Sequence, residues 1–252
     1  MTSEELDEVW ASVSAKVQRG AVSETAYLRA STYLQDLDNA DIAEYIDHTL
    51  LKPEATSDDI ERLCGAAWEH RFAAVCVNGC WVEFCRARLE GSGVKIGTVV
   101  GFPLGATSTE AKACETRDLV SRGAEEIDMV APLGHIIGND WEYVGADVKA
   151  VVDEAPGRTV KVIVESAALD AVHTVKAAAV AKEAGAGFVK TSTGFHPAGG
   201  ATIDAVRLLR LAVGDSLGVK AAGGIRDRAT ALRMIAAGAS RIGTSNGVAL
   251  LG

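Results

Sequence analysis

The sequence predicts an α/β protein built as a (β/α)8 barrel, with a helical extension at its N-terminus. From about residue 44 onward, short apolar runs alternate with segments of helical periodicity. Several of the helical segments end in glycine, which takes the left-handed conformation after a helix without steric cost. Apolar strands separated by helices indicate a parallel sheet covered on both faces, and eight strand–helix units favour a closed barrel.

The expected strands follow one another at regular intervals. They are Tyr45–His48, Phe72–Val77, Val94–Val100, Glu126–Val130, Val160–Glu165, Gly187–Thr191, Gly218–Ala221 and Arg241–Gly243. Helical spacing is clear in Ser57–His70, Thr109–Arg122, Ala171–Ala184 and Thr202–Val213. The helix-ending glycines are Gly123, Gly185 and Gly238. An open doubly wound sheet is the main alternative, but the fingerprint G-x-G-x-x-G is absent after the first strand, which weakens it.

Residues 1–40 differ from the barrel domain, which we assign to residues 41–252. Leu6, Trp10, Val13 and Val17 recur at helical spacing among many charged residues. We expect one or two helices outside the main fold. Their expected role is a cap over a barrel end or a subunit contact, in preference to a separate functional module.

The composition argues against several classes of protein. The net charge is −9, and no Lys/Arg cluster of the kind that nucleic-acid binders carry is present. No apolar window reaches the roughly 18 residues of a transmembrane helix, and the acidic N-terminus lacks a signal-peptide pattern. The five cysteines, an odd number, fit reduced thiols. We therefore expect a cytoplasmic protein whose partners include neither nucleic acid nor membrane.

Two lysines close neighbouring strands of the predicted barrel. Lys190 ends the sixth strand and Lys220 lies in the seventh, and neighbouring strands are about 4.8 Å apart. If both side chains point inward, like charge and desolvation lower a lysine pKa, and a neutral amine can attack a carbonyl to form a Schiff base. The alternative is two unrelated lysines, each paired with a carboxylate or extended toward water.

Three further polar residues accompany the lysines. Asp128, on the fourth strand, is a candidate for proton transfer through a water molecule, or else a charge partner. Asp47, at the end of the first strand, has a structural role as its alternative. Lys161 lies nearer the start of its strand, where it joins an inner polar network or pairs with one acidic residue.

Glycine and hydroxyl residues gather after the last three strands. The segments are Thr193-Gly194, Gly223-Gly224-Ile225-Arg226 and Gly243-Thr244-Ser245-Asn246-Gly247. Barrels often bind phosphate with the loops after strands seven and eight, because glycines let backbone N–H groups approach an anion. The pattern therefore favours a phosphate site over ordinary turns.

A metal site is not expected. Cys76, Cys80 and Cys85 lack the paired C-x2-C pattern of structural zinc, and the histidines do not form an H-x-x-x-H pair. We interpret Cys76 as a small residue inside the barrel.

Six segments resemble the deoxyribose-phosphate aldolase family in order and spacing, over about residues 44 to 250. They are IDHTLLKP (46–53), EIDMV (126–130), KVIVE (161–165), KTSTGF (190–195), KAAGGIR (220–226) and GTSNG (243–247). The pair KTSTG and K-A-x-G-G-[IV]-R is highly specific. The resemblance implies a (β/α)8 barrel that needs no metal or other cofactor. It also implies reversible cleavage of 2-deoxy-D-ribose 5-phosphate to acetaldehyde and D-glyceraldehyde 3-phosphate.

The resemblance also implies residue roles. Lys190 matches the Schiff-base lysine, Lys220 the second lysine that lowers the pKa of the first, and Asp128 the acid/base aspartate. Asp47, Lys161 and Thr193 match supporting positions, Cys76 matches a cysteine near the pocket, and the phosphate-loop positions are Gly194, Gly223, Gly224, Ser245 and Asn246.

Two positions depart from the family pattern. Phe195 stands where some members have a basic residue, and Asn246 replaces a second serine. Both changes touch phosphate binding, so they bear on phosphate affinity and on tolerance for unphosphorylated aldehydes.

Other functions stay open from the sequence alone. They are another Schiff-base barrel enzyme (a transaldolase or a keto-acid aldolase), a phosphate-binding isomerase or synthase without an imine, and a catalytically silent barrel that acts in assembly. For a barrel of this size we expect a homodimer or a homotetramer.

Overall fold

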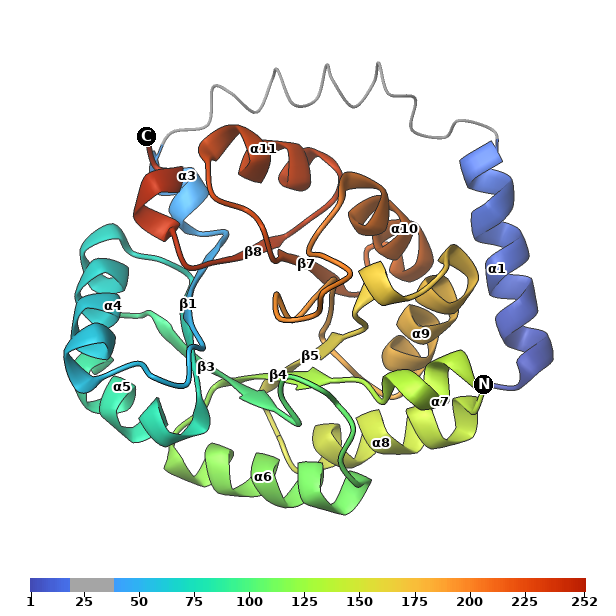
Figure 1. Cartoon of the computed structure of the whole chain (residues 1–252), viewed down its shortest axis with the longest axis horizontal. Helices are drawn as coiled ribbons and strands as arrows, with labels where there is room; N and C mark the ends of the chain where they lie inside the picture. Colours follow the sequence, from blue (N-terminus) through green and yellow to red (C-terminus); the bar gives the residue numbers. More distant parts are fainter. Residues whose placement is uncertain (19–38) are drawn as a thin grey trace.

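The computed structural model describes residues 1–18 and 39–252 and confirms the predicted TIM barrel. Eight parallel strands close in chain order, and β1 pairs with β8 through Asp47 and Gly243. Helices surround this barrel as an outer ring (Figure 1). The strands are β1 Ile46–Leu50, β2 Ala74–Val77, β3 Lys95–Val100, β4 Glu126–Val130, β5 Thr159–Ile163, β6 Phe188–Lys190, β7 Gly218–Ala222 and β8 Arg241–Thr244.

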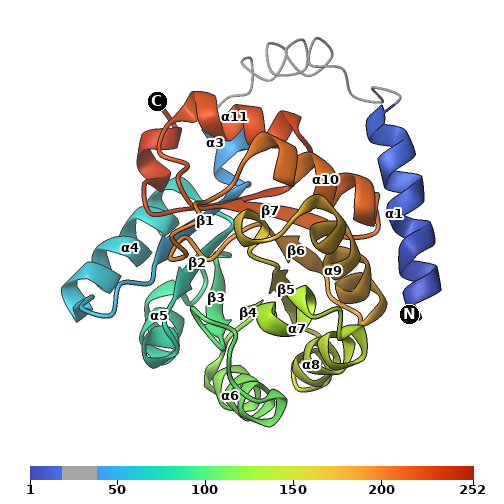
Figure 2. The same cartoon turned by 45° about the vertical axis from the view of Figure 1, so that its right-hand side comes forward.

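Figure 2 shows the helices that connect consecutive strands and cover the barrel. They are α4 Ser57–His70, α5 Val82–Leu89, α6 Thr109–Arg122, α7 Leu133–Ile137, α8 Trp141–Asp153, α9 Ala171–Glu183, α10 Ile203–Val213 and α11 Arg228–Ala236. In the described parts of the chain, the 3-10 helices η2 Gly79–Trp81 and η3 Ser166–Ala168 lie in connections between strands, η4 Gly247–Leu250 follows β8, and α3 Asn39–Ala43 precedes β1. None of the helices in the described parts of the chain is long and apolar enough to cross a bilayer.

Helices α4 and α6 have the bounds that the sequence predicts, because capping residues define them. Thr56 and Asp59 form a reciprocal capping box at the start of α4. Ser108 accepts a hydrogen bond from the Ala111 N–H at the start of α6, and Gly123 ends that helix with a φ of 112°.

The fifth strand is shorter than predicted. It ends at Ile163, whereas the apolar run predicted a strand through Glu165. Glu165 instead has a left-handed φ of 55°, and its carboxylate accepts hydrogen bonds from the N–H and hydroxyl of Thr193. The side-chain contact to the β6 loop accompanies a turn that hydrophobicity alone did not predict.

The two faces of the strands have opposite chemistry. Val162, Val189 and Val219 are fully or almost fully buried in the large apolar core. The intervening residues Lys161, Lys190 and Lys220 are buried too, and ion pairs join them to carboxylates from other strands. Since side chains alternate along a strand, the chain builds an apolar outer layer and a charged interior from the same segments.

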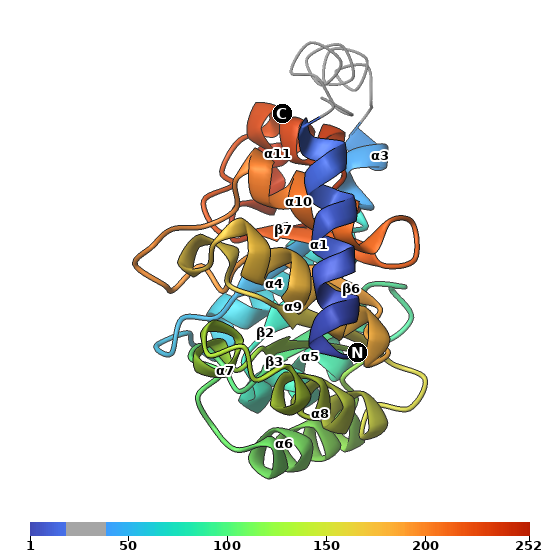
Figure 3. The same ribbon diagram turned by 90° about the vertical axis from the view of Figure 1, so that its right-hand side faces the viewer.

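Helix α1, Ser3–Gln18, lies against α9 and α10 on the flank of the barrel (Figure 3). Leu6 and Val13 are buried, and Lys176 of α9 forms an ion pair with Asp7. The helix therefore packs on the outer ring of helices and not over a barrel end. The alternative expectation, a subunit contact, stays a prediction. The remainder of the predicted extension, residues 19–38, lies outside the described residues.

A second buried ion pair lies outside the barrel interior and joins α6, α8 and the end of β4. The Lys112 ammonium donates to Asp147 Oδ2 at 2.6 Å and to the Val130 carbonyl at 2.9 Å, and both charged side chains are 0% exposed. The Thr109 hydroxyl donates to the other Asp147 oxygen at 2.9 Å. This arrangement satisfies both charges and fixes two helices to the strand that carries Asp128.

We predict that Lys112→Met destabilises the protein by about 3–5 kcal/mol, because it leaves the Asp147 carboxylate buried without its cation. Urea unfolding monitored by circular dichroism measures this loss. The matched control is Lys149→Met, which breaks a pair whose side chains are each 58% exposed and should cost less than about 1 kcal/mol. Equal losses in the two variants would contradict the assignment.

Candidate active site

The structure brings Lys190 and Lys220 together inside the barrel. They are direct partners in the register of β6 and β7, and their side chains are 2% and 0% exposed. The Lys190 ammonium lies 2.8 Å from Asp128 Oδ2, and that of Lys220 lies 2.7 Å from the same oxygen. Gly243 leaves room for this arrangement, because a Cβ there would lie 3.0 Å from Lys220 Cε.

Asp128 is the centre of the cluster. Its Oδ2 receives both lysines, and its Oδ1 lies 3.1 Å from the Lys161 ammonium. No described residue donates a hydrogen bond to Oδ1 with good geometry. The carboxylate therefore faces both amines and keeps acceptor capacity for a substrate hydroxyl or a water molecule.

Asp47 and Lys161 lie in the same network. Lys161 approaches Asp47 Oδ2 at 3.0 Å and Glu126 Oε2 at 2.5 Å, and Lys220 also donates to Asp47. Lys161 thus contacts three carboxylates. Of the two expectations for this residue, the structure agrees with an inner polar network and not with a single ion pair.

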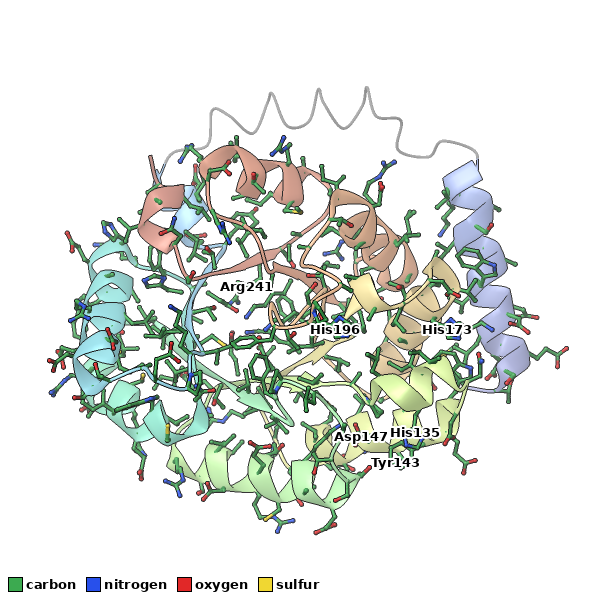
Figure 4. The ribbon with its side chains drawn as sticks, in the orientation of Figure 1. His135, Tyr143, Asp147, His173, His196 and Arg241 are labelled. Carbon is green, nitrogen blue, oxygen red and sulfur yellow. The ribbon has the colours of Figure 1, made fainter. Side chains whose placement is uncertain are left out.

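Sequence reasoning missed two members of this network. Glu126 and Arg241 are joined by contacts of 3.3 and 3.4 Å, and Arg241 donates to Asp47 Oδ1 at 2.6 Å. Figure 4 labels Arg241 near the centre of the ring of helices. The signal for Glu126 was its position two residues before Asp128, which places both on one face of β4.

The loop after β6 is tied to its neighbours. Thr193 donates to the Glu165 carboxylate through its N–H at 3.2 Å and through its hydroxyl at 2.6 Å. Two residues earlier, the Thr191 hydroxyl accepts the Ala222 N–H at 3.1 Å and donates to the Ala222 carbonyl at 3.2 Å. These bonds fix the segment that directly follows Lys190, and Glu165 is another residue that the sequence did not indicate.

The predicted phosphate residues lie in adjacent loops. Gly194, Gly223 and Gly224 have φ values of 82°, 89° and 83°, which glycine adopts without strain. A Cβ on Gly194 would lie 3.7 Å from Gly223 Cα, so these two loops touch. Ser245 and Asn246 are exposed after β8, and the Asn246 amide donates to the Arg226 carbonyl of the β7 loop at 3.2 Å.

An apolar pocket of 660 Å³ lies between the loops after β3, β4, β5 and β6, and neither Lys190 nor Lys220 is among its lining residues. Leu104, Pro132, Glu165, Phe195 and His196 are among its lining residues. Phe195 is half exposed and meets the Phe102 ring edge-on at 5.1 Å between centroids. The Phe195 side chain therefore lines this pocket, whereas Gly194, Gly223 and Gly224 are not among its lining residues.

Comparisons with known proteins identify the family. Residues 42–251 match the family described as DeoC/LacD family aldolase. The chain belongs to that family.

This aldolase is similar to curated relatives over nearly all of the barrel. It is 53% identical to the deoxyribose-phosphate aldolase of Alkaliphilus oremlandii, over 83% of this chain and 95% of the relative. It is 52% identical to that of Thermotoga petrophila, over 84% and 85%. The tetrameric deoxyribose phosphate aldolase of Aeropyrum pernix superposes with a TM-score of 0.83 at 35% identity, covering 91% of this chain and 97% of that one.

The buried amines of the aldolase have different proton affinities. Burial lowers the pKa of Lys190, and repulsion from Lys220 lowers it further against the attraction of Asp128. Burial also acts against the charged form of Lys220, but Asp128 and Asp47 outweigh it, so that the pKa of Lys220 is raised. Of these two amines, Lys190 therefore loses its proton more readily, and desolvation contributes more to the lowering of its pKa than the second cation does.

The neighbouring carboxylates stay ionised. Burial acts against the charged form of Asp128, but Lys161, Lys190 and Lys220 hold the pKa of its carboxyl well below the usual range. The pKa of Asp47 is lowered in the same way, by Lys161, Lys220 and Arg241 against burial. Among the described residues, no group of His, Cys, Asp and Glu side chains could hold a metal ion.

Cys76 lies on β2 in a small apolar cluster with Leu51, Val99 and Phe102. It is 1% exposed, and burial followed by the negative charge of Asp128 raises the pKa of its thiol. Since the thiolate is the nucleophilic form, this environment makes Cys76 unreactive despite its place near the lysines.

We predict that iodoacetamide at neutral pH alkylates exposed Cys80 and Cys114 well before Cys76. Burial and the raised thiol pKa both lower the thiolate concentration that the reagent meets. Time-resolved peptide mapping measures the order of labelling. Cys76 labelled as early as the two exposed cysteines would show that this environment is wrong.

Proposed function

We propose that this enzyme reversibly cleaves 2-deoxy-D-ribose 5-phosphate to acetaldehyde and D-glyceraldehyde 3-phosphate through a Schiff base on Lys190. One observation carries the proposal. Two buried lysines meet the same oxygen of Asp128, and only the pKa of Lys190 is lowered. A neutral amine beside a retained cation and a carboxylate is the set of groups that imine formation requires. Similarity to deoxyribose-phosphate aldolases supports this substrate.

The reaction begins when neutral Lys190 attacks the open-chain aldehyde of the sugar. The carbinolamine loses water to give the protonated imine, and Lys220 and Asp128, aided by a water molecule, supply and accept the protons. The same carboxylate then accepts the proton of the C3 hydroxyl as the C2–C3 bond breaks, and the bonding electrons pass into the imine to give an enamine. Glyceraldehyde 3-phosphate leaves, and the enamine takes up a proton and is hydrolysed to acetaldehyde.

The phosphate group belongs at the loops after β6, β7 and β8 in this proposal. The glycines at 194, 223 and 224 let backbone N–H groups approach an anion, and Ser245 adds an exposed hydroxyl. Phe195 supplies no positive charge, so phosphate binding depends on the backbone. Its contact with the apolar pocket supports tolerance for unphosphorylated aldehydes.

We place the reaction in deoxynucleoside catabolism in the cytoplasm, with no metal or other cofactor. The absence of disulfides among the described cysteines supports a reducing compartment. A homodimer or homotetramer is our proposal for the assembly, and the tetrameric relative from Aeropyrum pernix supports it.

Borohydride added with deoxyribose 5-phosphate is expected to inactivate the enzyme by reducing the imine, leaving a small fragment on Lys190. Peptide mapping by mass spectrometry locates the adduct. Lys190→Ala should abolish both turnover and adduct, whereas Lys95→Ala, at an exposed lysine on β3, should retain both.

The outcomes separate this proposal from its rivals. Insensitivity to borohydride during turnover would favour an isomerase or synthase without an imine. Failure to use acetaldehyde as donor would favour a transaldolase or a keto-acid aldolase. An adduct that persists in Lys190→Ala would reject the lysine assignment, and a complete lack of turnover would favour a silent barrel.

We expect Lys220→Leu to raise the Lys190 pKa, because it removes a neighbouring cation. The neutral fraction of Lys190 at neutral pH then falls, and the acid limb of the profile of kcat/KM moves to higher pH. The pH–rate profile of the variant measures this shift. A slower enzyme with the limb unmoved would mean that Lys220 transfers protons without controlling Lys190.

A further inference from the structure

The barrel interior holds more charged groups than the proposed reaction uses. Arg241, the first residue of β8, and Glu126, the first residue of β4, take no part in the chemistry described above. Arg241 nevertheless donates to Asp47 at 2.6 Å and to Glu126 at 3.3 Å, and Glu126 also contacts Lys161. An unbroken chain of ion pairs therefore runs from Arg241 to Asp128 and Lys190.

The numbers of positive and negative groups in this chain differ by one. The described interior contains three carboxylates, Asp47, Glu126 and Asp128, and four basic groups, Lys161, Lys190, Lys220 and Arg241. An unbalanced charge is costly away from water, so three cations and one neutral base is the favoured state. Arginine does not lose its proton in proteins, so the neutral base must be one of the three lysines.

The contacts select which lysine is neutral. Lys161 reaches three carboxylates and Lys220 reaches two, whereas Lys190 reaches Asp128 alone. The single oxygen available to Lys190 is also shared with Lys220. The least supported cation is thus the one at the reacting position.

No other charged group in the barrel changes this count. β2 contributes the Cys76 thiol, whose raised pKa keeps it neutral. β3 begins with Lys95, which lies outside and pairs with Glu125. Glu165, after β5, is buried too, but its carboxylate accepts hydrogen bonds from Thr193 and forms no ion pair with a lysine or arginine among the described residues.

We propose that Arg241 and Glu126 are positioning residues whose opposite charges shift the proton affinity of Lys190 in opposite directions. The proposal rests on the function above, in which Lys190 is the nucleophile. Arg241 occupies Asp47 Oδ1 and part of Glu126, so the three carboxylates have attraction left for only two lysines. Neither residue touches the substrate; they act through Asp47, Lys161 and Lys220 on Lys190.

Substitution of each residue should shift the Lys190 pKa in the opposite direction to substitution of the other. Arg241→Gln removes a permanent cation, so the interior can hold one more proton and the Lys190 pKa should rise by about one unit. Glu126→Gln removes an anion and should lower the Lys190 pKa by a similar amount. The double variant loses one charge of each sign and should return close to the wild-type titration.

The test is an NMR titration of the lysine ε-carbons in protein carrying carbon-13-labelled lysine, with Lys190→Met to assign the resonance. The acid limb of the kcat/KM profile should move in the same direction as the titration in each variant. Arg241→Lys retains the charge and should titrate close to wild type. Arg117→Gln, which breaks an exposed pair with Glu154, is the control that should leave the titration unchanged.

Shifts of the same sign in Arg241→Gln and Glu126→Gln, or no shift in either, would overturn the proposal, because mere loss of structure does not produce opposite signs. Should Arg241→Gln fail to fold by circular dichroism, Glu126→Gln and the double variant still test the opposite arm. The titration needs no turnover. If wild-type protein formed no borohydride adduct on Lys190, the proposed function would be rejected. The NMR titration would still test the effect of Arg241 and Glu126 on the Lys190 pKa.

Discussion

The structure depends on one carboxylate oxygen that two buried lysines approach at once. Asp128 Oδ2 attracts both Lys190 and Lys220, yet the dry interior disfavours holding both as cations beside it. Lys220 has Asp47 as additional support and keeps its proton more firmly, while Lys190 has none. This asymmetry, between two residues of the same type on adjacent strands, shifts their pKa values in opposite directions.

The barrel supplies this asymmetry through its geometry. Alternation along each strand sends Glu126 and Asp128 inward together, and the register aligns Asp128 with Lys161 and Lys190 with Lys220. The outward residues meanwhile form the apolar layer beneath the helices, which keeps the interior away from water. Buried ion pairs contribute little net stability because desolvation offsets their attraction, so the interior is better explained by chemistry than by stability.

Much of this was predictable from the sequence. Chain order, the eight strands and the bounds of α4 and α6 follow from apolar periodicity and caps, and proximity of Lys190 to Lys220 follows from consecutive parallel strands. Contacts across the barrel were not predictable, because they depend on stagger that a single sequence does not specify. Arg241 looked like the ordinary start of a strand, yet it reaches Glu126 on β4, on the opposite side of the barrel.

Two other differences between expectation and structure come from contacts with residues distant in the sequence. Glu165 was assigned to a strand by its apolar neighbours, but its carboxylate bonds to Thr193 and the backbone leaves the sheet. Phe195 was compared with a basic phosphate-loop residue, although its ring lines the apolar pocket beside Phe102. In both cases a tertiary contact decided a conformation that neighbouring residues along the chain left open.

The pairing of β1 with β8 determines when the charged interior can form. The carboxylate of Asp47 comes from the first strand and the guanidinium of Arg241 from the last, so their contact exists only once the ring has closed. The full set of interior charges is therefore complete only in a chain that has been synthesised through its last strand.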